Sequence, residues 1–130
     1  DRPMIYYVIQ KLKQVGVDEI IVNVYHHAEQ IINYLRDNNS FGINIKISYE
    51  DELLDTGGGL KKASFFFDDE IPFILHNVDI ISSINLTAML QYHISQKNLV
   101  TLAVKKRITS RYLLFDSQSQ LNYYSAIKES

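Results

Sequence analysis

The amino-acid sequence predicts an α/β fold in which helices cover both faces of a Rossmann-like, doubly wound and mainly parallel sheet. Two observations lead to this prediction. Segments with apolar residues at helical spacing alternate with short segments rich in Val and Ile, which is the pattern of repeated strand–helix units. Residues 19–25 are apolar on both faces, as a buried parallel strand is. The 130 residues suffice for one domain, so we expect a single domain over 1–130.

Each predicted element has its own local signal. Residues 3–15 carry apolar side chains at helical spacing, Pro3 suits a first helical turn, and Gly16 ends the helix. Residues 43–50 alternate Ile with polar neighbours, as a strand with one wetter face does. The predicted elements are, in order, helix 3–15, strand 19–25, helix 28–37, strand 43–50, short helix 60–67, strand 72–80, helix 85–97, strands 99–106 and 111–116, a turn at 117–120 and a weak strand at 121–127.

Composition excludes several classes of function. The net charge of -2 gives no basic field that would attract nucleic acid or an anionic membrane. The sequence has no cysteine, which excludes disulfides and thiol chemistry and fits a reducing compartment. No apolar run approaches the roughly 20 residues of a membrane-spanning helix, and the first residues do not read as a signal peptide. We therefore expect a cytoplasmic protein that binds neither nucleic acid nor membranes.

The segment EDELLDTGGGLKKASFF, residues 50–66, contains three of the five glycines, Gly57, Gly58 and Gly59. Bare backbone before a helix lets a flat ligand such as a nucleobase or a ribose approach the main chain, and it directs free N–H groups outward. Glycine clusters also mark simple turns, which is the commoner explanation. The residues alone leave both explanations open.

The predicted strand 72–80 ends in Asn77 and Asp79. In open α/β sheets the ligand crevice lies at the carboxyl ends of the strands. A carboxylate there can hold a Mg²⁺ ion that also binds phosphates. Asp79 could equally cap the following turn, which Asp does readily. The sequence does not decide between these two roles.

The four histidines and the short basic runs are weaker candidates. His26 and His27 are adjacent and point apart, so they make a poor metal pair, and we expect them to pack or cap at the start of the next helix. We expect His76 and His93 to be packed or hydrogen-bonded. The basic residues that could contact an anion, but that are more often solvated surface, are Lys61, Lys62, Lys105, Lys106 and Arg107.

Taken together, LLDTGGGLKKA and the later FILHNVDIISSINLTAMLQYH resemble the sugar-phosphate nucleotidyltransferases, in particular the mannose-1-phosphate guanylyltransferase and MurNAc-phosphate uridylyltransferase types. The opening RPMIYYVIQKLKQVGVDEIIVNVYHHAEQI is similar to the segment that follows the family's signature loop, and TSRYLLFD to its strand beyond the metal site. The resemblance covers nearly the whole chain.

This resemblance implies a reaction and a set of site residues. The family joins a nucleoside triphosphate to a sugar 1-phosphate and releases pyrophosphate, with Mg²⁺ as cofactor. By the resemblance, Thr56, Gly57 and Gly58 would line the base and the ribose, Asn77 would lie near the ribose or the sugar, and Asp79 would be a Mg²⁺ ligand. The guanylyl and uridylyl members are favoured, but neither the base nor the sugar is specified.

The resemblance also implies that a strand with a Gly-x-Gly-x-Arg loop comes before this sequence in the family, and that a second metal carboxylate comes after it. We therefore expect a partial domain, shortened at both ends and inactive alone. In the family the additional strand lies between residues 19–25 and residues 72–78. We expect these two strands to close up, a neighbouring chain to fill the gap by homo-oligomerisation or strand exchange, or the segment to exist in a longer protein.

Two other functions stay open. One is a non-catalytic module of the same fold that binds a nucleotide or a partner subunit. The other is a doubly wound regulatory domain with Asp79 in an acidic pocket, which would need acidic residues at several strand ends.

Overall fold

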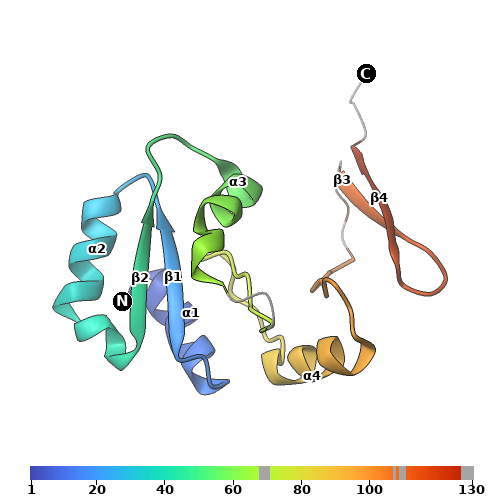
Figure 1. The fold of residues 1–130 in the computed structure, drawn as a ribbon, viewed down its shortest axis with the longest axis horizontal. Helices are drawn as coiled ribbons and strands as arrows, with labels where there is room; N and C mark the ends of the chain where they lie inside the picture. The colour runs from blue at the N-terminus through green and yellow to red at the C-terminus, as the bar shows by residue number, and fades with distance from the viewer. Residues whose placement is uncertain (68–70, 107, 109–110, 127–130) are drawn as a thin grey trace. The chain divides into compact units, whose positions relative to one another are not determined.

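The computed structural model describes residues 1–67, 71–106, 108 and 111–126. Its contacts divide the chain into two units, Asp1–Leu90 and Gln91–Ser130. None of the helices described is long and apolar enough to cross a bilayer. The elements are helices α1 (Met4–Gln14), α2 (Ala28–Asp37), α3 (Asp55–Lys62) and α4 (Leu86–Gln96), 3-10 helices η1 (Asn39–Gly42) and η2 (Ala63–Phe66), and strands β1 (Glu19–Val24), β2 (Asn44–Tyr49), β3 (Arg111–Phe115) and β4 (Leu121–Ala126) (Figure 1).

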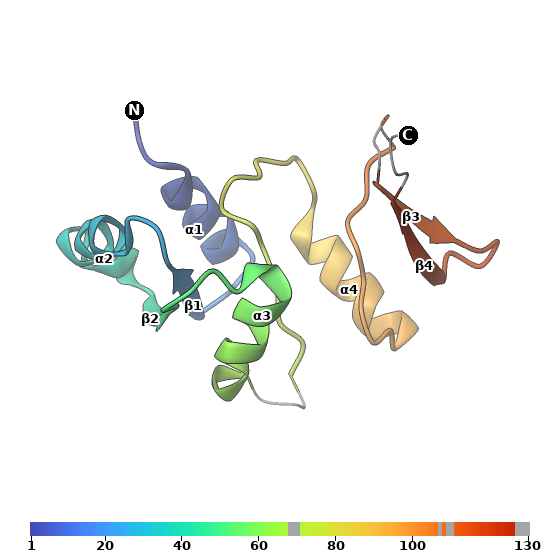
Figure 2. The ribbon, with the colours of Figure 1, turned by 90° about the horizontal axis from the view of Figure 1, so that it is seen from above.

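The first unit is built on a parallel pair of strands. β1 and β2 pair in register from Glu19 with Asn44 to Val24 with Tyr49, which confirms the predicted parallel pairing. Figure 2 shows α1 and α2 on one face of this pair and α3 on the opposite face. Helices on both faces are typical of parallel strands, whose two faces are usually covered.

Helix α1 supplies more buried apolar residues to this unit than any other described element. Its buried residues are Val8, Ile9 and Leu12, and Leu86 of α4 completes the cluster with Val8 and Leu12. Ile20 of β1 packs against the same cluster. The helical spacing in residues 3–15 therefore marks the core-facing side of α1, as predicted.

Helix α1 ends before Gly16 because of the backbone conformation of this glycine. Gly16 has φ +86°, a left-handed conformation that glycine adopts at little cost. Its N–H donates to the Lys13 carbonyl at 3.1 Å, and the Val17 N–H donates to the Leu12 carbonyl at 3.2 Å. These two bonds form a Schellman motif, which satisfies carbonyls that the helix end would otherwise leave free.

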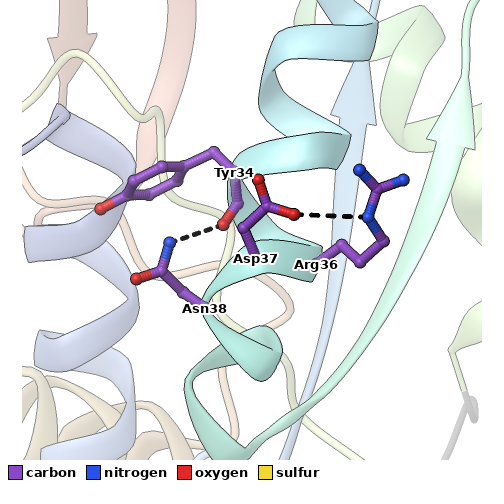
Figure 3. A network of polar contacts seen from close by, with 4 residues as sticks. All are labelled: Tyr34, Arg36, Asp37 and Asn38. Atoms are coloured by element: carbon purple, nitrogen blue, oxygen red, sulfur yellow. Dashed lines mark hydrogen bonds and ion pairs between the residues drawn. The ribbon is translucent and has the colours of Figure 1, made fainter.

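Helix α2 has the bounds that its periodicity predicts, and its end is closed by local contacts (Figure 3). The Asn38 Nδ2 donates to the Tyr34 carbonyl at 2.8 Å. The Arg36 Nε lies 3.4 Å from the Asp37 Oδ1, and both of these side chains are exposed. A pair of this kind contributes little to stability, so apolar packing of the helix against the sheet determines its position.

The second unit contains an antiparallel hairpin of β3 and β4. The Asp116 Oδ1 accepts hydrogen bonds from the Gln118 N–H at 2.8 Å and from the Gln120 N–H at 2.9 Å, which fixes the turn. The predicted strand 111–116 and the turn at 117–120 are thus confirmed, and the strand predicted at 121–127 forms over Leu121–Ala126. Residue 127 lies outside the described residues.

Two predicted strands are wrong. Residues 72–80 and 99–106 are extended or irregular and belong to no sheet, and their apolar side chains are largely exposed, Leu75 at 56% and Leu99 at 96%. A strand needs a neighbour for its backbone N–H and C=O groups, and no strand in the part of the chain described here lies beside either segment. A run of apolar residues indicates that a segment would gain from burial, but it does not identify the strand with which the segment would pair.

The first of the three outcomes that we considered, closure of residues 19–25 on residues 72–78, does not occur in the described structure. Within the described residues, β1 pairs with β2 alone. The other two outcomes, a strand from a neighbouring chain or from a longer protein, stay predictions.

The glycine run is not the loop that we expected. Helix α3 begins at Asp55 rather than at residue 60, so Gly57, Gly58 and Gly59 lie inside it. The positive φ of this region belongs to Asp55, at +55°, and not to a glycine. Glycine is a poor helix former, so contacts with the rest of the unit must hold these residues in the helix.

Replacement of Asp55 by glycine should stabilise the protein. A side chain in the left-handed region costs about 1–2 kcal/mol, and the flexibility of glycine in the unfolded chain returns about 0.5–1 kcal/mol of that. We expect Asp55→Gly to raise the free energy of unfolding by about 0.5–1 kcal/mol in urea denaturation.

The matched control is Asp18→Gly. Asp18 is an exposed loop residue without positive φ, so glycine there should lower the free energy of unfolding by about 0.5–1 kcal/mol. Equal destabilisation by both substitutions would contradict the strain assigned to Asp55.

Candidate functional site

The three consecutive glycines of α3 have three different surroundings. A Cβ added at Gly57 would meet nothing within 4 Å, whereas one at Gly58 would lie 2.9 Å from the Leu54 Cβ. At Gly59, which is buried, a Cβ would collide with the side-chain nitrogen of Asn23 and would lie 2.5 Å from the Glu50 Oε1. Successive helical residues are about 100° apart, so the run turns from open surface to the sheet.

The start of α3 is anchored by a buried carboxylate. Glu50 follows β2 directly and is 6% exposed, and its Oε2 accepts a hydrogen bond from the Leu54 N–H at 3.2 Å. The first N–H groups of a helix, here including those of Thr56 and Gly57, have no acceptor within the helix. Together with the partial positive charge at a helix start, they favour an oxygen-rich ligand.

Asn77 and Asp79 share one turn. The Asn77 carbonyl accepts hydrogen bonds from the Ile80 N–H at 3.3 Å and from the His76 Nδ1 at 2.8 Å. The exposed Asp79 carboxylate makes no hydrogen bond or ion pair within the ranges that the structure describes. The turn is therefore closed by backbone, and Asp79 does not cap it.

Helix α1 holds the segment that carries this turn. Ile74 packs against the apolar cluster of α1. Beyond the turn, the Lys11 Nζ donates to the Ser82 carbonyl at 2.7 Å and contacts the Ser82 Oγ at 3.0 Å. Although the segment is not a strand, both of its ends are thus attached to a packed helix, with Asn77 and Asp79 between them.

A divalent cation at Asp79 is compatible with its surroundings. Mg²⁺ is usually held by one or two carboxylates together with substrate phosphates and water, and a carboxylate without a competing partner is such a ligand. No cluster of three His, Cys, Asp or Glu side chains suited to a metal occurs among the residues with described positions. In that same part of the chain, no hydrogen bond or ion pair links the start of α3 to the turn at 77–80, so a ligand would have to bridge them.

The histidines play minor roles. The His26 ring packs on the Tyr25 ring at a centroid distance of 4.5 Å, as the packing prediction expected. His27 occupies the N-cap position of α2 with φ +55° but makes no side-chain cap bond, so the predicted polar cap is wrong for it. The His93 Nδ1 lies 3.0 Å from the Thr101 Oγ1, which confirms a hydrogen-bonded histidine.

The basic candidates lie on the surface. Lys61 is exposed, and the Lys62 Nζ lies 3.3 Å from the Asp51 Oδ2. Lys105 and Lys106 are exposed as well, whereas Arg107 lies outside the described residues. These lysines match the solvated surface that short basic runs usually form.

Three polar residues near α3 were not among our candidates: the exposed Asn23 and the buried Ser48 and Glu50. The alternation in residues 43–50 assigns Ser48 and Glu50 to the wetter face of β2, yet they are only 4% and 6% exposed, whereas Tyr49 is 50% exposed. The reason is that α3 covers that face at the carboxyl end of the strands. A glutamate placed directly between a strand and a glycine run is the signal that could have identified this site.

Comparison with known proteins places this geometry in a family. The family model described as nucleotidyl transferase matches residues 1–115. A UTP–glucose-1-phosphate uridylyltransferase of Synechocystis is 33% identical over 116 residues, which are 80% of this chain and 29% of that protein.

Two guanylyltransferases show similar likeness. A probable mannose-1-phosphate guanylyltransferase 1 of Oryza sativa subsp. japonica is 36% identical over 109 residues, 82% of this chain and 30% of the relative. A D-glycero-alpha-D-manno-heptose 1-phosphate guanylyltransferase of Aneurinibacillus thermoaerophilus is 35% identical over 105 residues, 81% of this chain and 45% of the relative. The chain thus spans less than half the length of these relatives. The glycine helix seated on a parallel strand pair and the match over residues 1–115 lead to one conclusion, that this chain belongs to the nucleotidyl transferase family.

Proposed function

We propose that the protein transfers a nucleotidyl group from a nucleoside triphosphate to a sugar 1-phosphate and releases pyrophosphate. The observation that carries this proposal is the start of α3, where Gly57 leaves one side of the backbone open. A base or a ribose can lie against such bare backbone. The names of the relatives, which are uridylyl- and guanylyltransferases of sugar 1-phosphates, support this class of substrates.

The proposed reaction requires no covalent bond to the protein. A phosphate oxygen of the sugar 1-phosphate attacks the α-phosphorus, the bond from that phosphorus to the oxygen bridging it to the β-phosphorus breaks, and pyrophosphate leaves with the electron pair. Catalysis then consists of positioning and of stabilising negative charge. In this proposal Thr56, Gly57 and Gly58 line the base and the ribose, and Asn77 contacts the ribose or the sugar.

Asp79 is the proposed ligand for Mg²⁺. Its carboxylate is exposed and free of other partners in the described part of the chain, as a ligand for a hard cation must be. When bound, the ion would supply positive charge to the phosphates. Asp79 would keep the Mg²⁺ ion at the turn that follows residues 72–76.

We also propose that a further strand lies between β1 and residues 72–76 in the complete protein, either from the same chain or from a neighbouring copy. In the structure as described, β1 pairs on one side only, with β2, and residues 72–76 belong to no sheet. Such a strand would satisfy both sets of backbone groups and would extend the parallel pair into the doubly wound sheet.

A bulky side chain at Gly57 should block the nucleotide without disturbing the fold. The space beside Gly57 is empty to 4 Å, and leucine is a far better helix former than glycine. In steady-state assays of the full-length protein, we expect Gly57→Leu to raise the KM for the nucleotide about tenfold, which is about 1.4 kcal/mol.

The same variant should keep the KM for the sugar 1-phosphate and should not lower the midpoint of urea unfolding. Gly57→Ala, which adds a single methyl group, is the graded control and should have an intermediate KM. An unchanged nucleotide KM in Gly57→Leu would contradict the placement of the nucleotide on this side of α3.

Removal of the Asp79 carboxylate should abolish the proposed metal-dependent turnover. We expect Asp79→Asn, which keeps the shape and loses the charge, to lower kcat by about 10²–10³ and to raise the Mg²⁺ concentration needed for half-maximal rate. The measurement is pyrophosphate release against Mg²⁺ concentration, with GTP and UTP each supplied together with mannose or glucose 1-phosphate.

Asp37→Asn is the matched control. Asp37 is an exposed carboxylate at the end of α2, and within the described residues it pairs with Arg36 alone. Its loss should leave the Mg²⁺ dependence unchanged. Wild-type rates for Asp79→Asn at every Mg²⁺ concentration would remove Asp79 from the site.

A further inference from the structure

We infer that Asn23 is a positioning residue for the nucleotide, because its side chain holds α3 at a fixed place over the carboxyl end of the sheet. This inference rests on the proposed function, which places the nucleotide at the start of α3. It concerns a residue that contacts the helix and not the substrate.

The register of the sheet places Asn23, which is exposed, on the face of the strand pair that α3 approaches. Asn23 of β1 pairs with Ser48 of β2, and paired residues of a parallel ladder point to the same face. Glu50, two residues after Ser48, continues that face. These three polar residues therefore lie on the face of the strand pair on which Figure 2 shows α3.

Asn23 and Glu50 reach the helix at the same point. Both the Asn23 amide nitrogen and the Glu50 Oε1 lie within 2.5 Å of the position that a Cβ of Gly59 would occupy, so the two atoms are no more than about 5 Å apart. Glu50 contacts the helix a second time through its bond to the Leu54 N–H. Asn23 of β1 and Glu50, which follows β2, thus both meet α3 at Gly59. We call these two side chains the seat of α3.

Helix α3 depends on this seat more than most helices do. It has eight residues, of which three are glycine. Helices shorter than about 12 residues are marginal in water, and each glycine costs about 1 kcal/mol relative to alanine. Since local preference does not hold α3, its contacts with the strands set where Thr56 and Gly57 present their N–H groups.

The primary test is a kinetic comparison in the full-length protein. In Asn23→Ala we expect the nucleotide KM to rise about five- to tenfold, since loss of the packing contact beside Gly59 lets the helix shift and weakens binding. The kcat and the KM for the sugar 1-phosphate should stay within about twofold. If the substitution only reduced the folded fraction, kcat would fall and both KM values would remain, and that result would overturn the inference.

Ser48→Ala is the matched control. Ser48 lies on the same face between the other two residues, and its buried hydroxyl has no hydrogen-bond partner in the structure as described. Its removal leaves no partner unpaired, so the nucleotide KM should stay within about twofold of wild type. A rise equal to that of Asn23→Ala would show a general sensitivity of this face and would overturn the specific role of Asn23.

A double substitution tests the contact itself. In Gly59→Ala the added methyl group meets both the Asn23 and the Glu50 side chains, so these side chains or α3 must shift. In Gly59→Ala/Asn23→Ala one of these two obstacles is removed, and the clash with Glu50 remains. We expect the double variant to have a lower nucleotide KM than the product of the two single effects predicts, because contacting residues are not additive. Strict additivity would contradict the contact.

Amide hydrogen exchange separates this inference from the proposed function. Asn23→Ala should speed exchange in residues 54–59 about tenfold while α1 and α2 stay protected, whether or not the protein has transferase activity. If amide exchange in residues 54–59 stayed unchanged in Asn23→Ala, the inference that Asn23 holds α3 would be wrong. If the seat is confirmed but wild-type protein shows no nucleotidyl transfer with any nucleotide, the proposed function fails and the role of Asn23 in nucleotide binding fails with it.

Discussion

The close approach of α3 to the strand pair at Gly59 is the constraint on which the candidate site depends. Only a residue without a Cβ leaves room for the Asn23 and Glu50 side chains. Because these side chains come from neighbouring strands, one glycine fixes the helix relative to both. The burial of Glu50 is consistent with this close approach.

The glycine run therefore serves two purposes that the sequence alone does not separate. Gly58 and Gly59 are bare because the chain's own side chains occupy the space, at Leu54 for one and at Asn23 and Glu50 for the other. Gly57 alone opens to solvent. The glycines that pack against the chain and the glycine that is open to a ligand are thus neighbours on one helix. The composition of this region predicts a turn or a ligand-binding loop, but the region forms a helix.

Local periodicity predicted the elements whose signals are local. α1, α2 and α4 follow from apolar spacing, Gly16 from its capping role, and β1 with β2 from β-branched runs of suitable length. The strands predicted at 72–80 and 99–106 failed because a strand is completed by a distant partner, about which a run of Ile, Leu and Val says nothing. The start of α3 failed for the opposite reason, since tertiary contacts overrode the low helix propensity of glycine. Of the site, the sequence suggested Thr56, Gly57, Gly58, Asn77 and Asp79 by resemblance, whereas Asn23 and Glu50 emerge only when the strands are paired.

The most direct measurement of the central claim is an NMR titration of the ¹⁵N-labelled full-length protein with GTP, and separately with UTP, in the presence of Mg²⁺. If the start of α3 receives the nucleotide, the largest amide shifts will fall on Thr56 and Gly57, with small shifts across α2. Shifts concentrated elsewhere in the protein, or none with either nucleotide, would contradict the assignment of this helix as the nucleotide site.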